Sequence, residues 1–276
     1  MARTSFTDLP RTVLAKLAEL TGDFQEFVPA AAGNHAEVVG ELRTSLGRAF
    51  IKGVRLFPEQ RGGGAEAWSL LNEATVLPSV RPFAPELLWK VDTGGWRFVG
   101  FEVIDGRHAD FSPGSPDLNL VVGAVAALSQ LPCPPSVKLR VEERYKRVGE
   151  SAEAFAGPTI IHTDLNPENV LIDTAGRVKF VDWAFVSRGA PWLDLAYMVP
   201  WMIRDGWRPD RAESWLAGFP LWKCADPVHV ELFVSLLYRT WLPRAADADT
   251  DSWVAHYFAL VREWHQSRVM LALERG

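Results

Sequence analysis

Four polar residues of the chain have types and spacing that suit phosphoryl transfer. His162, Asp164 and Asn169 interrupt two β-branched apolar runs in "IIHTDLNPENVLI", and Asp182 ends the later apolar run "RVKFVD". A carboxylate can orient an attacking hydroxyl and accept its proton, while amide and carboxylate oxygens are the hard ligands that magnesium prefers beside phosphate groups. The set therefore indicates a base at Asp164 and metal ligands at Asn169 and Asp182.

Each of these residues also has an ordinary structural interpretation. Taken singly, Asp164, Asn169 and Asp182 could be helix caps or turn residues, and a lone histidine such as His162 is more often a satisfied core residue than a catalyst. The joint spacing favours a role in catalysis. Asn169 follows Asp164 by five residues, as in the catalytic-loop pattern H-x-D-x-x-x-x-N, and Asp182 follows Asn169 by thirteen, where that pattern is followed by a metal-binding Asp. We expect His162 to brace the loop rather than to transfer protons.

The segments before residue 107 predict a small lobe built on a sheet. After an opening helix, short alternating segments separated by turn signals predict antiparallel strands at 24–28, 36–42, 47–54, 86–91 and 96–103. One helix is inserted before the fourth strand, because apolar residues recur there at helical spacing: Ala67, Leu70, Leu71, Ala74 and Leu77. We predict a first lobe at 1–101 and a hinge at 102–106.

The remainder, residues 107–276, predicts a larger and mostly helical lobe, so the fold class is α+β. Helices are expected at 117–131, at 136–155 and over nearly everything from Trp192 onward, with short extended pieces at 160–172 and 177–183. Nine of the twelve tryptophans lie from Trp183 onward. Core packing in amphipathic helices explains most of them, although so many rings could also line a substrate pocket with flat apolar walls.

Composition limits the classes of partner. The net charge of −5 and the pI near 5.7 argue against a nucleic-acid or anionic-membrane surface. Cys133 and Cys224 lack metal-ligand spacing, so neither a disulfide framework nor a zinc site is expected. The N-terminal segment lacks the apolar run of a signal peptide, and the longest apolar stretch, from Leu120, is far shorter than the ~20 residues of a membrane span. We expect a cytoplasmic protein with no nucleic-acid or membrane partner.

With these motifs the chain resembles the aminoglycoside phosphotransferase-like kinases, relatives of the protein kinases and of choline and macrolide kinases. "HTDLNPEN" is similar to the catalytic loop of that family, and "VDWAFVSRGAPWLDLA" to its metal-Asp motif with a second Asp about a dozen residues on. The resemblance implies a bilobal protein-kinase-like fold and a magnesium-dependent transfer of the γ-phosphate of ATP or GTP to a hydroxyl of a small molecule. It assigns Asp164 as the base, Asn169 and Asp182 as magnesium ligands, and Asp194 as a structural acceptor of backbone hydrogens from the catalytic loop.

Two positions depart from the family's pattern. Thr163 stands where "HGD" commonly has glycine, and Ala190 stands where "GDP" has aspartate. Neither change removes a reacting group. Both make the identity of the substrate harder to assign, because the neighbouring loop can adopt another position.

The resemblance also implies a phosphate clamp in the first lobe. Lys52, a lone polar residue in the apolar strand "AFIKGV", would contact the α- and β-phosphates, with Glu73 as its ion-pair partner and Glu66 as the reserve candidate. An edge-strand lysine and a solvated helix position are the alternative interpretations of Lys52 and Glu73. Lys52 is expected to be solvated, so that its loss would leave the fold intact.

Two further segments would complete the nucleotide site in this comparison. The turn "AAAGNHAE" would cover the phosphates through Gly33, Asn34 and His35, although it is poorer in glycine than G-x-G-x-x-G. The hinge "FEVIDG" would offer main-chain groups of Glu102 to Ile104 to the purine edge.

The balance of charge in the second lobe limits the chemical class of the acceptor, and two functions, a kinase and a binding module, stay open. From residue 183 onward eleven acidic residues accompany ten basic ones, and a polycationic aminoglycoside would prefer a more acidic cleft. The balance favours a neutral or weakly charged hydroxylated metabolite or antibiotic. The alternative function is a catalytically silent kinase-like binding module, whereas a protein kinase is disfavoured because Asp182 is not followed by D-F-G and A-P-E elements. The acceptor, the choice of ATP or GTP and the oligomeric state stay open.

Overall fold

The computed structural model describes residues 3–31, 36–149, 152–249 and 252–275. The chain divides into two compact units, one of residues 1–106 with 179–185 and one of residues 107–178 with 186–276. The predicted lobe limits at 101 and 107 stay predictions. The structure adds a feature that the sequence did not indicate, since the segment 179–185 groups with the first unit and brings Asp182 with it.

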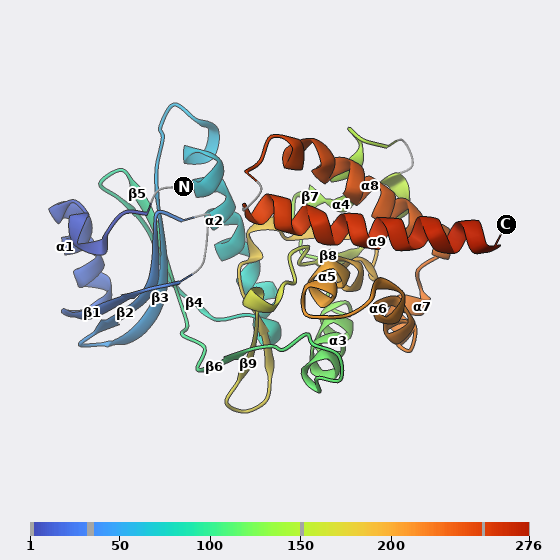
Figure 1. Ribbon diagram of the computed structural model, residues 1–276. Helices are drawn as coiled ribbons and strands as arrows, with labels where there is room; N and C mark the ends of the chain where they lie inside the picture. Colours follow the sequence, from blue (N-terminus) through green and yellow to red (C-terminus); the bar gives the residue numbers. More distant parts are fainter. Residues whose placement is uncertain (1–2, 32–35, 150–151, 250–251, 276) are drawn as a thin grey trace. The chain divides into compact units, whose positions relative to one another are not determined.

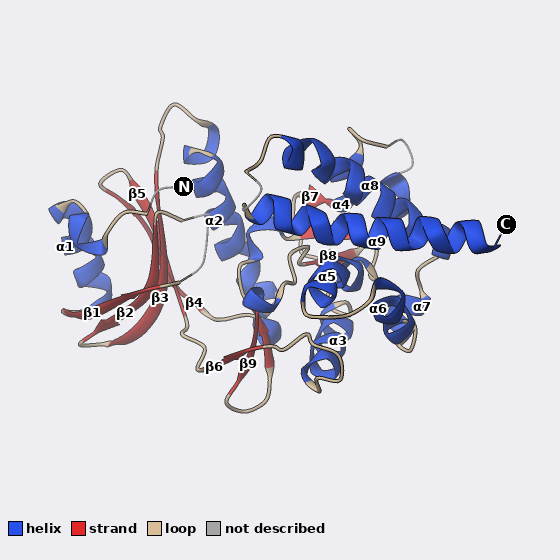
Figure 2. Cartoon of the chain, in the orientation of Figure 1, coloured by secondary structure: helices blue, strands red, loops and turns tan. Residues whose placement is uncertain are grey.

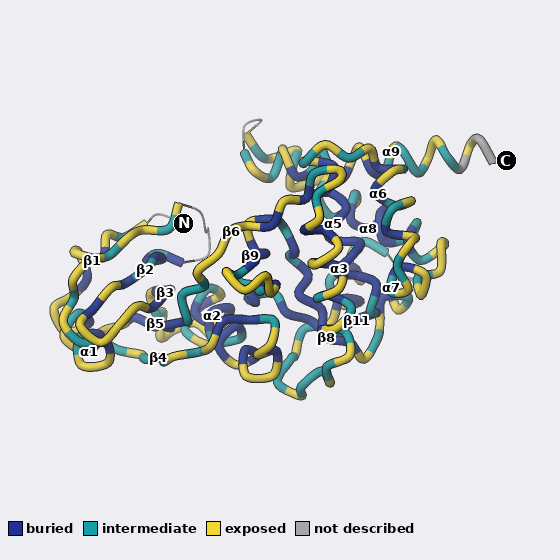
Figure 3. Tube along the Cα trace, turned by 90° about the horizontal axis from the view of Figure 1, so that it is seen from below, coloured by how far each residue is buried: buried dark blue, intermediate teal, exposed yellow. Residues whose placement is uncertain are grey.

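The first unit is built on a five-stranded antiparallel sheet (Figures 1 and 2). Its strands, in the order β1-β2-β3-β5-β4, are β1 (Phe24–Pro29), β2 (Val38–Thr44), β3 (Gly47–Arg55), β5 (Trp96–Phe101) and β4 (Leu87–Thr93). All five strands predicted from alternating hydrophobicity are present, with ends that differ by a few residues. Figure 3 shows that β2 and β5 are mostly buried and that β3 is exposed at its ends, whereas the edge strands β1 and β4 have no buried residue.

Two helices cover opposite faces of this sheet, as Figure 1 shows for α1 (Arg11–Thr21) and α2 (Ala65–Val76). Successive side chains of a strand point to opposite faces. Ile51 therefore joins the apolar cluster beneath α1, where Val13 and Leu17 are fully buried. Its neighbour Lys52 points to the face that α2 covers, and its side chain reaches that helix.

The inserted helix α2 lies where helical spacing of apolar residues predicted it. It ends at Val76 because Pro78 follows, and a proline lacks the backbone N–H that would continue the hydrogen-bond ladder. The chain then passes through two 3₁₀ turns before β4.

The 3₁₀ turns of the described residues are Phe6–Asp8, Arg61–Gly63, Leu77–Ser79, Arg81–Phe83, Ala152–Phe155, Pro167–Asn169 and Trp183–Phe185.

The second unit is mainly helical. Its helices are α3 (Asp117–Leu128), α4 (Val141–Tyr145), α5 (Leu193–Arg204), α6 (Pro209–Leu216), α7 (Pro220–Lys223), α8 (Pro227–Ala246) and α9 (Trp253–Arg275). A small sheet in the order β7-β11-β8, with β7 (Leu139–Arg140), β11 (Ser187–Gly189) and β8 (Thr159–Ile161), accompanies them. A second small sheet has the order β10-β9-β6, with β10 (Val178–Phe180), β9 (Val170–Asp173) and β6 (Gly106–His108), and its residues 106, 179 and 180 are grouped with the first unit. Among the described residues, no helix is both long and apolar enough to cross a bilayer.

The predictions for this unit were mostly confirmed, with one correction. The helix expected at 117–131 is α3, and residues from Leu193 onward are largely helical. A continuous helix at 136–155 is wrong, since among the described residues of this range 141–145 form an α-helix and 152–155 a separate 3₁₀ turn. Residues 139–140 instead pair with β11, and Gly149 passes so close to α8 that an added Cβ would lie 2.3 Å from the Leu236 side chain. These long-range contacts override the local helical spacing.

The core of the second unit is aromatic. The ring of Phe233 on α8 is fully buried and meets several other rings edge to face, those of Tyr145, Phe155, Trp192 and Tyr197. Trp192 and Trp264 are also buried. For these two tryptophans the structure shows the core packing that the sequence analysis favoured.

Candidate active site

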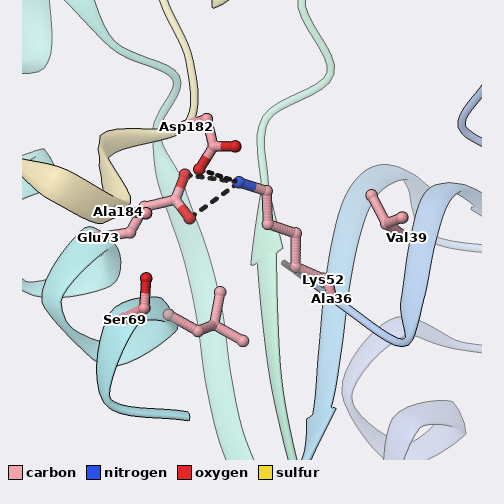
Figure 4. Close-up of a pocket in the computed structure, with 8 residues that line it drawn as sticks. Ala36, Val39, Lys52, Ser69, Glu73, Asp182 and Ala184 are labelled. Carbon is pink, nitrogen blue, oxygen red and sulfur yellow. Dashed lines mark hydrogen bonds and ion pairs between the residues drawn. The ribbon is translucent and has the colours of Figure 1, made fainter. Parts of the chain in front are cut away.

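Three of the predicted site residues meet within the first unit, and Figure 4 shows their side chains pointing toward one another. The ammonium of Lys52 on β3 donates to both carboxylate oxygens of Glu73 on α2, at 3.0 and 2.9 Å. The same Nζ lies 3.1 Å from Asp182 Oδ1. Glu73 also accepts the backbone N–H of Trp183 at 3.4 Å. The ion pair predicted from the sequence is present, and it involves Glu73 rather than the reserve candidate Glu66.

This cluster is more buried than expected. The side chains of Lys52, Glu73 and Asp182 are only 15%, 5% and 25% exposed. The expectation of a solvated Lys52 is therefore wrong, because α2 and the segment 179–185 cover the ammonium group. Removing Lys52 would leave two carboxylates facing each other in a site of low dielectric, which is strongly unfavourable.

Burial and charge shift the pKa values of the cluster in a consistent way. Burial alone would lower the pKa of Lys52, but the negative charges of Asp182 and Glu73 outweigh it and raise the pKa. Burial raises the pKa of Glu73, and although Lys52 opposes this rise, the nearby charge of Asp182 adds to it. A single ammonium thus balances two carboxylates, and the charged form of Glu73 depends on Lys52.

A small cavity lies against this cluster, lined also by Ala36, Val39, Ser69, Leu70 and Ala184 (Figure 4). Its volume is about 30 Å³, enough for a water-sized group but far below the several hundred Å³ of a typical ligand site. The cavity is not itself a nucleotide site. Its polar side chains fix where the Lys52 ammonium is held.

The other residues predicted to contact the nucleotide lie in the turn at 33–35 and in the hinge. Gly33, Asn34 and His35 lie outside the described residues. Glu102 uses its backbone N–H to donate to Glu86 O at 2.9 Å, which extends the sheet, so only its carbonyl could meet a purine. Within the described residues, the half-buried Ile104 makes no backbone hydrogen bond to another backbone group.

In the second unit, the loop between β8 and β9 holds the predicted base. Asp164 Oδ1 accepts the side-chain amide of Asn166 at 3.1 Å, and Asp164 Oδ2 accepts that of Asn169 at 3.1 Å. Asn169 also donates to the carbonyl of Asp164 at 2.9 Å. Two amide donors therefore fix the orientation of the carboxylate without neutralising its charge. Because Asn169 directs its amide nitrogen to Asp164, its amide oxygen points elsewhere, as a metal ligand must.

Asp194 anchors this loop in the way that the family resemblance implied. The carboxylate is 1% exposed and accepts two backbone N–H groups, from Thr163 at 2.8 Å and from His162 at 2.9 Å. Burial raises the pKa of Asp194 to about 6, although these two hydrogen bonds and the charge of Arg144 oppose the rise. His162 is fully buried and accepts the N–H of Asp164 at 3.3 Å, so it braces the loop as expected.

Thr163 and Asp182 are the non-glycine residues of the described chain with left-handed backbone conformations, at φ 72° and 63°. Aspartate tolerates this region fairly well, but a β-branched residue such as threonine rarely adopts it. The family's glycine would fit the conformation of Thr163 without strain. The hydrogen bond from the backbone N–H of Thr163 to Asp194 helps to hold this strained conformation.

The sequence analysis missed Asn166 as a site residue. This residue caps the 3₁₀ turn Pro167–Asn169, where its Oδ1 accepts the N–H of Asn169 at 2.9 Å, while its amide holds Asp164. An asparagine directly before a proline is a common start for a helical turn. That local signal could have shown that Asn166 links the proposed base to the proposed metal ligand.

The types of oxygen atom on the two predicted metal ligands can be compared with those that magnesium prefers. Across the part of the chain that the structure describes, no three His, Cys, Asp or Glu side chains gather in a way that could hold an ion. The amide oxygen of Asn169 in the second unit and the carboxylate of Asp182 in the first are each of a type that magnesium accepts, and magnesium usually takes only one or two protein ligands and completes its shell with phosphate oxygens and water. The residues present fit a metal that arrives with a nucleotide.

Comparisons with known proteins agree with the motifs. The sequence model of the phosphotransferase enzyme family matches residues 134–231, a segment that contains Asp164, Asn169, Asp182 and Asp194. No curated protein sequence matches the chain. The resemblance to aminoglycoside phosphotransferase-like kinases, which rested on these same residues, is confirmed.

Solved structures extend the likeness over nearly the whole chain. An aminoglycoside phosphotransferase from Alicyclobacillus acidocaldarius subsp. acidocaldarius superposes with a TM-score of 0.61 and 15% identity, covering 98% of each chain. Choline kinase LicA from Streptococcus pneumoniae gives 0.59 and 12%, covering 92% of this chain and 98% of the other. A structure of LicA in complex with AMP gives 0.59 and 12%, covering 96% and 99%. At these identities the likeness shows the fold, and the kinase-like α+β fold is confirmed.

Proposed function

We propose that this chain is a kinase that transfers the γ-phosphate of ATP or GTP to a hydroxyl of a small molecule, either an antibiotic or a hydroxylated metabolite. Asp164 is the base in this proposal, Asn169 and Asp182 are the magnesium ligands, and Lys52 positions the phosphates. Family and fold support a phosphotransferase. The residue roles, the nucleotide and the metal are the parts that need experiment.

The observation that carries the proposal is the way Asp164 is held. Each of its carboxylate oxygens accepts one amide, from Asn166 and from Asn169, and the loop backbone beside it is tied to the buried Asp194. A general base must be oriented before it can accept a proton in the transition state. Neutral amide donors orient a carboxylate while leaving its negative charge for the acceptor hydroxyl.

The Lys52 cluster supports the nucleotide part of the proposal. An ammonium held by Glu73 and Asp182 is fixed in position and, because its pKa is raised, stays charged at neutral pH. Such a charge can contact phosphate oxygens without reorganisation during the reaction. Bound magnesium would neutralise charge that develops on the phosphates, and LicA, one of the structural neighbours, was solved with AMP.

Two measurements, made one after the other, test this function. The first is a thermal-shift titration with ATP and GTP, each with and without magnesium, in which we expect a magnesium-dependent rise in the melting temperature. The second is a screen of hydroxylated compounds, including aminoglycosides, macrolides, choline, nucleosides and glycosides, for acceptance of labelled γ-phosphate. Asp164→Asn is the matched control, since it keeps the size of the side chain and removes its charge.

The outcomes separate the two functions left open by the sequence. Magnesium-dependent nucleotide binding together with phosphate transfer that Asp164→Asn abolishes supports the kinase. A wild-type protein that binds neither nucleotide with magnesium, and phosphorylates nothing, would instead be the silent binding module.

A further inference from the structure

Four aromatic side chains of the second unit form what we call the aromatic cluster: Trp201 on α5, Trp241 on α8, and Trp253 and Tyr257 on α9. The ring centroid of Tyr257 lies 5.1 Å from that of Trp201 and 4.8 Å from that of Trp241, and Trp241 lies 5.5 Å from Trp253. Tyr257 is buried, Trp201 and Trp241 are half-buried, and Trp253 is 55% exposed. The aromatic cluster thus runs from the interior of the unit to its surface.

The buried end of the aromatic cluster lies beside the catalytic loop. Glu168 of that loop accepts a hydrogen bond from Arg204 at 2.8 Å, and the same guanidinium lies 5.1 Å from the ring centroid of Trp201. Burial raises the pKa of Tyr257, and the ionisable groups of Tyr197 and Asp164 add to the rise. Through Glu168 and Arg204, the loop that holds Asp164 is therefore linked to the ring of Trp201.

The charged groups nearest Trp201 and Trp241 do not suit a cationic ligand. A guanidinium already lies over Trp201, and that of Arg244 lies 4.8 Å from the ring centroid of Trp241. The two carboxylates beside Trp201, those of Glu168 and Asp205, are both engaged by Arg204, at 2.8 and 2.9 Å. A cation stacked on these rings would meet like charge and would find these carboxylates already paired.

We propose that the aromatic cluster binds the acceptor, and that the acceptor is an uncharged hydroxylated compound that carries a planar conjugated ring. This inference rests on the proposed function, because it takes Asp164 as the residue that receives the acceptor hydroxyl. The parts of the Trp201 and Trp241 rings that Arg204, Arg244 and Tyr257 leave uncovered, together with the 55% exposed ring of Trp253, offer apolar surface against which such a ring can pack. A bound ring gains affinity there without needing a counter-charge. Of the nine C-terminal tryptophans, Trp183, Trp192, Trp222 and Trp264 are buried, whereas Trp201, Trp241 and Trp253 belong to the aromatic cluster.

A matched pair of acceptors tests the class directly. Phenyl β-glucoside and methyl β-glucoside have the same sugar hydroxyls and differ only in the ring, while kanamycin and choline supply cationic comparators. With magnesium and ATP or GTP, we expect kcat/KM for the phenyl glucoside to exceed that for the methyl glucoside by about tenfold, the effect of one or two aromatic contacts. A preference for kanamycin or choline overturns the inference.

Variants of the aromatic cluster test its part in binding. Trp201→Leu and Trp241→Leu should each raise KM for the phenyl glucoside by roughly two- to tenfold, with KM for the nucleotide unchanged, and Trp201→Phe should restore most of the loss. Trp215→Leu is the control, because Trp215 is half-buried in the same unit and meets other rings, those of Trp207 and Phe219. Equal effects of Trp201→Leu and Trp215→Leu on acceptor KM would show that the rings serve packing only.

A binding measurement separates failure of this inference from failure of the kinase function. Saturation-transfer NMR reports whether the phenyl protons of the glucoside contact the protein, whether or not phosphate is transferred. Ring-dependent contact that weakens in Trp201→Leu, without phosphate transfer to any compound, supports the aromatic cluster and contradicts the kinase. If neither ring-dependent contact nor ring-dependent phosphate transfer is observed, the inference is overturned.

Discussion

Replacing Lys52 by methionine should destabilise the first unit by an amount that grows with pH. Methionine keeps most of the length of the side chain but removes the cation between Glu73 and Asp182, which are 5% and 25% exposed. Removing one partner of a buried ion pair typically costs about 3–5 kcal/mol of unfolding free energy. Most of the cost should fall on Glu73, since it is the less exposed carboxylate.

Protonation of Glu73 sets an upper limit to this cost. An ordinary glutamate has a pKa of about 4.3, so keeping its side chain neutral at pH 7 costs about 4 kcal/mol, and at pH 5 about 1 kcal/mol. The pKa of Glu73 is already raised by burial, and the loss of the Lys52 charge would raise it further. The folded variant therefore takes up a proton that the unfolded chain lacks. Its deficit in unfolding free energy, relative to the wild type, rises between pH 5 and pH 7.

Urea unfolding followed by circular dichroism from pH 5 to pH 8 measures this deficit. Arg55→Met on the same strand is the control, because the Arg55–Glu37 ion pair has a similar length of 3.0 Å but Arg55 is 55% exposed. Glu37 is 12% exposed but keeps the backbone N–H of Arg55 at 3.0 Å after the substitution, so the loss of stability should be smaller than in Lys52→Met. In Lys52→Met/Glu73→Gln the buried carboxylate is gone, so most of the pH dependence should vanish. A deficit in Lys52→Met that is independent of pH, or no larger than that of Arg55→Met, would refute the reasoning.

Three further predictions concern the second unit and the metal. Asp164→Asn should lower single-turnover phosphate transfer by roughly 10²–10⁴-fold while changing the dissociation constant of magnesium-nucleotide little; transfer at the wild-type rate would remove Asp164 from the chemistry. Asn169→Ala and Asp182→Ala should each weaken nucleotide binding measured by calorimetry with magnesium present, and unchanged affinity in both would contradict the metal assignment. The pKa of Asp194, raised to about 6 in the folded state, means that the folded protein binds a proton more tightly than the unfolded one. Its contribution to the unfolding free energy should fall by about 3 kcal/mol as pH rises from about 4 to about 6. The stability difference between wild type and Asp194→Asn should show this slope, and a flat difference would contradict it.

Local patterns in the sequence predicted the elements that position the site. Alternation marked the strand that carries Lys52, helical spacing marked α2, and the motif spacing marked Asp164 and Asn169. The contact of Asp194 with the loop backbone followed from the family resemblance. These features were predictable because each depends on residues close together in the chain or on a motif with a fixed geometry.

Features that depend on distant segments were not predictable in the same way. The burial of Lys52 arises from α2 and the segment 179–185, which no local pattern brings onto β3. The expected helix at 136–155 failed because β11, much later in the chain, pairs with residues 139–140. Tyr257 carries no motif, and only the packing of α9 against α5 brings its ring to Trp201.

The segment 179–185 makes the first unit discontinuous in sequence, which limits how the protein can be divided. Trp183 in this segment is fully buried, and the carbonyl of Ala184 accepts a hydrogen bond from Asn72 of α2 at 3.2 Å. A fragment that stops at the hinge would lack these groups and would leave α2 with an uncovered apolar face. We expect neither half of the chain to fold autonomously, so a chimera that exchanges the N-terminal lobe between relatives must carry its own copy of this seven-residue segment.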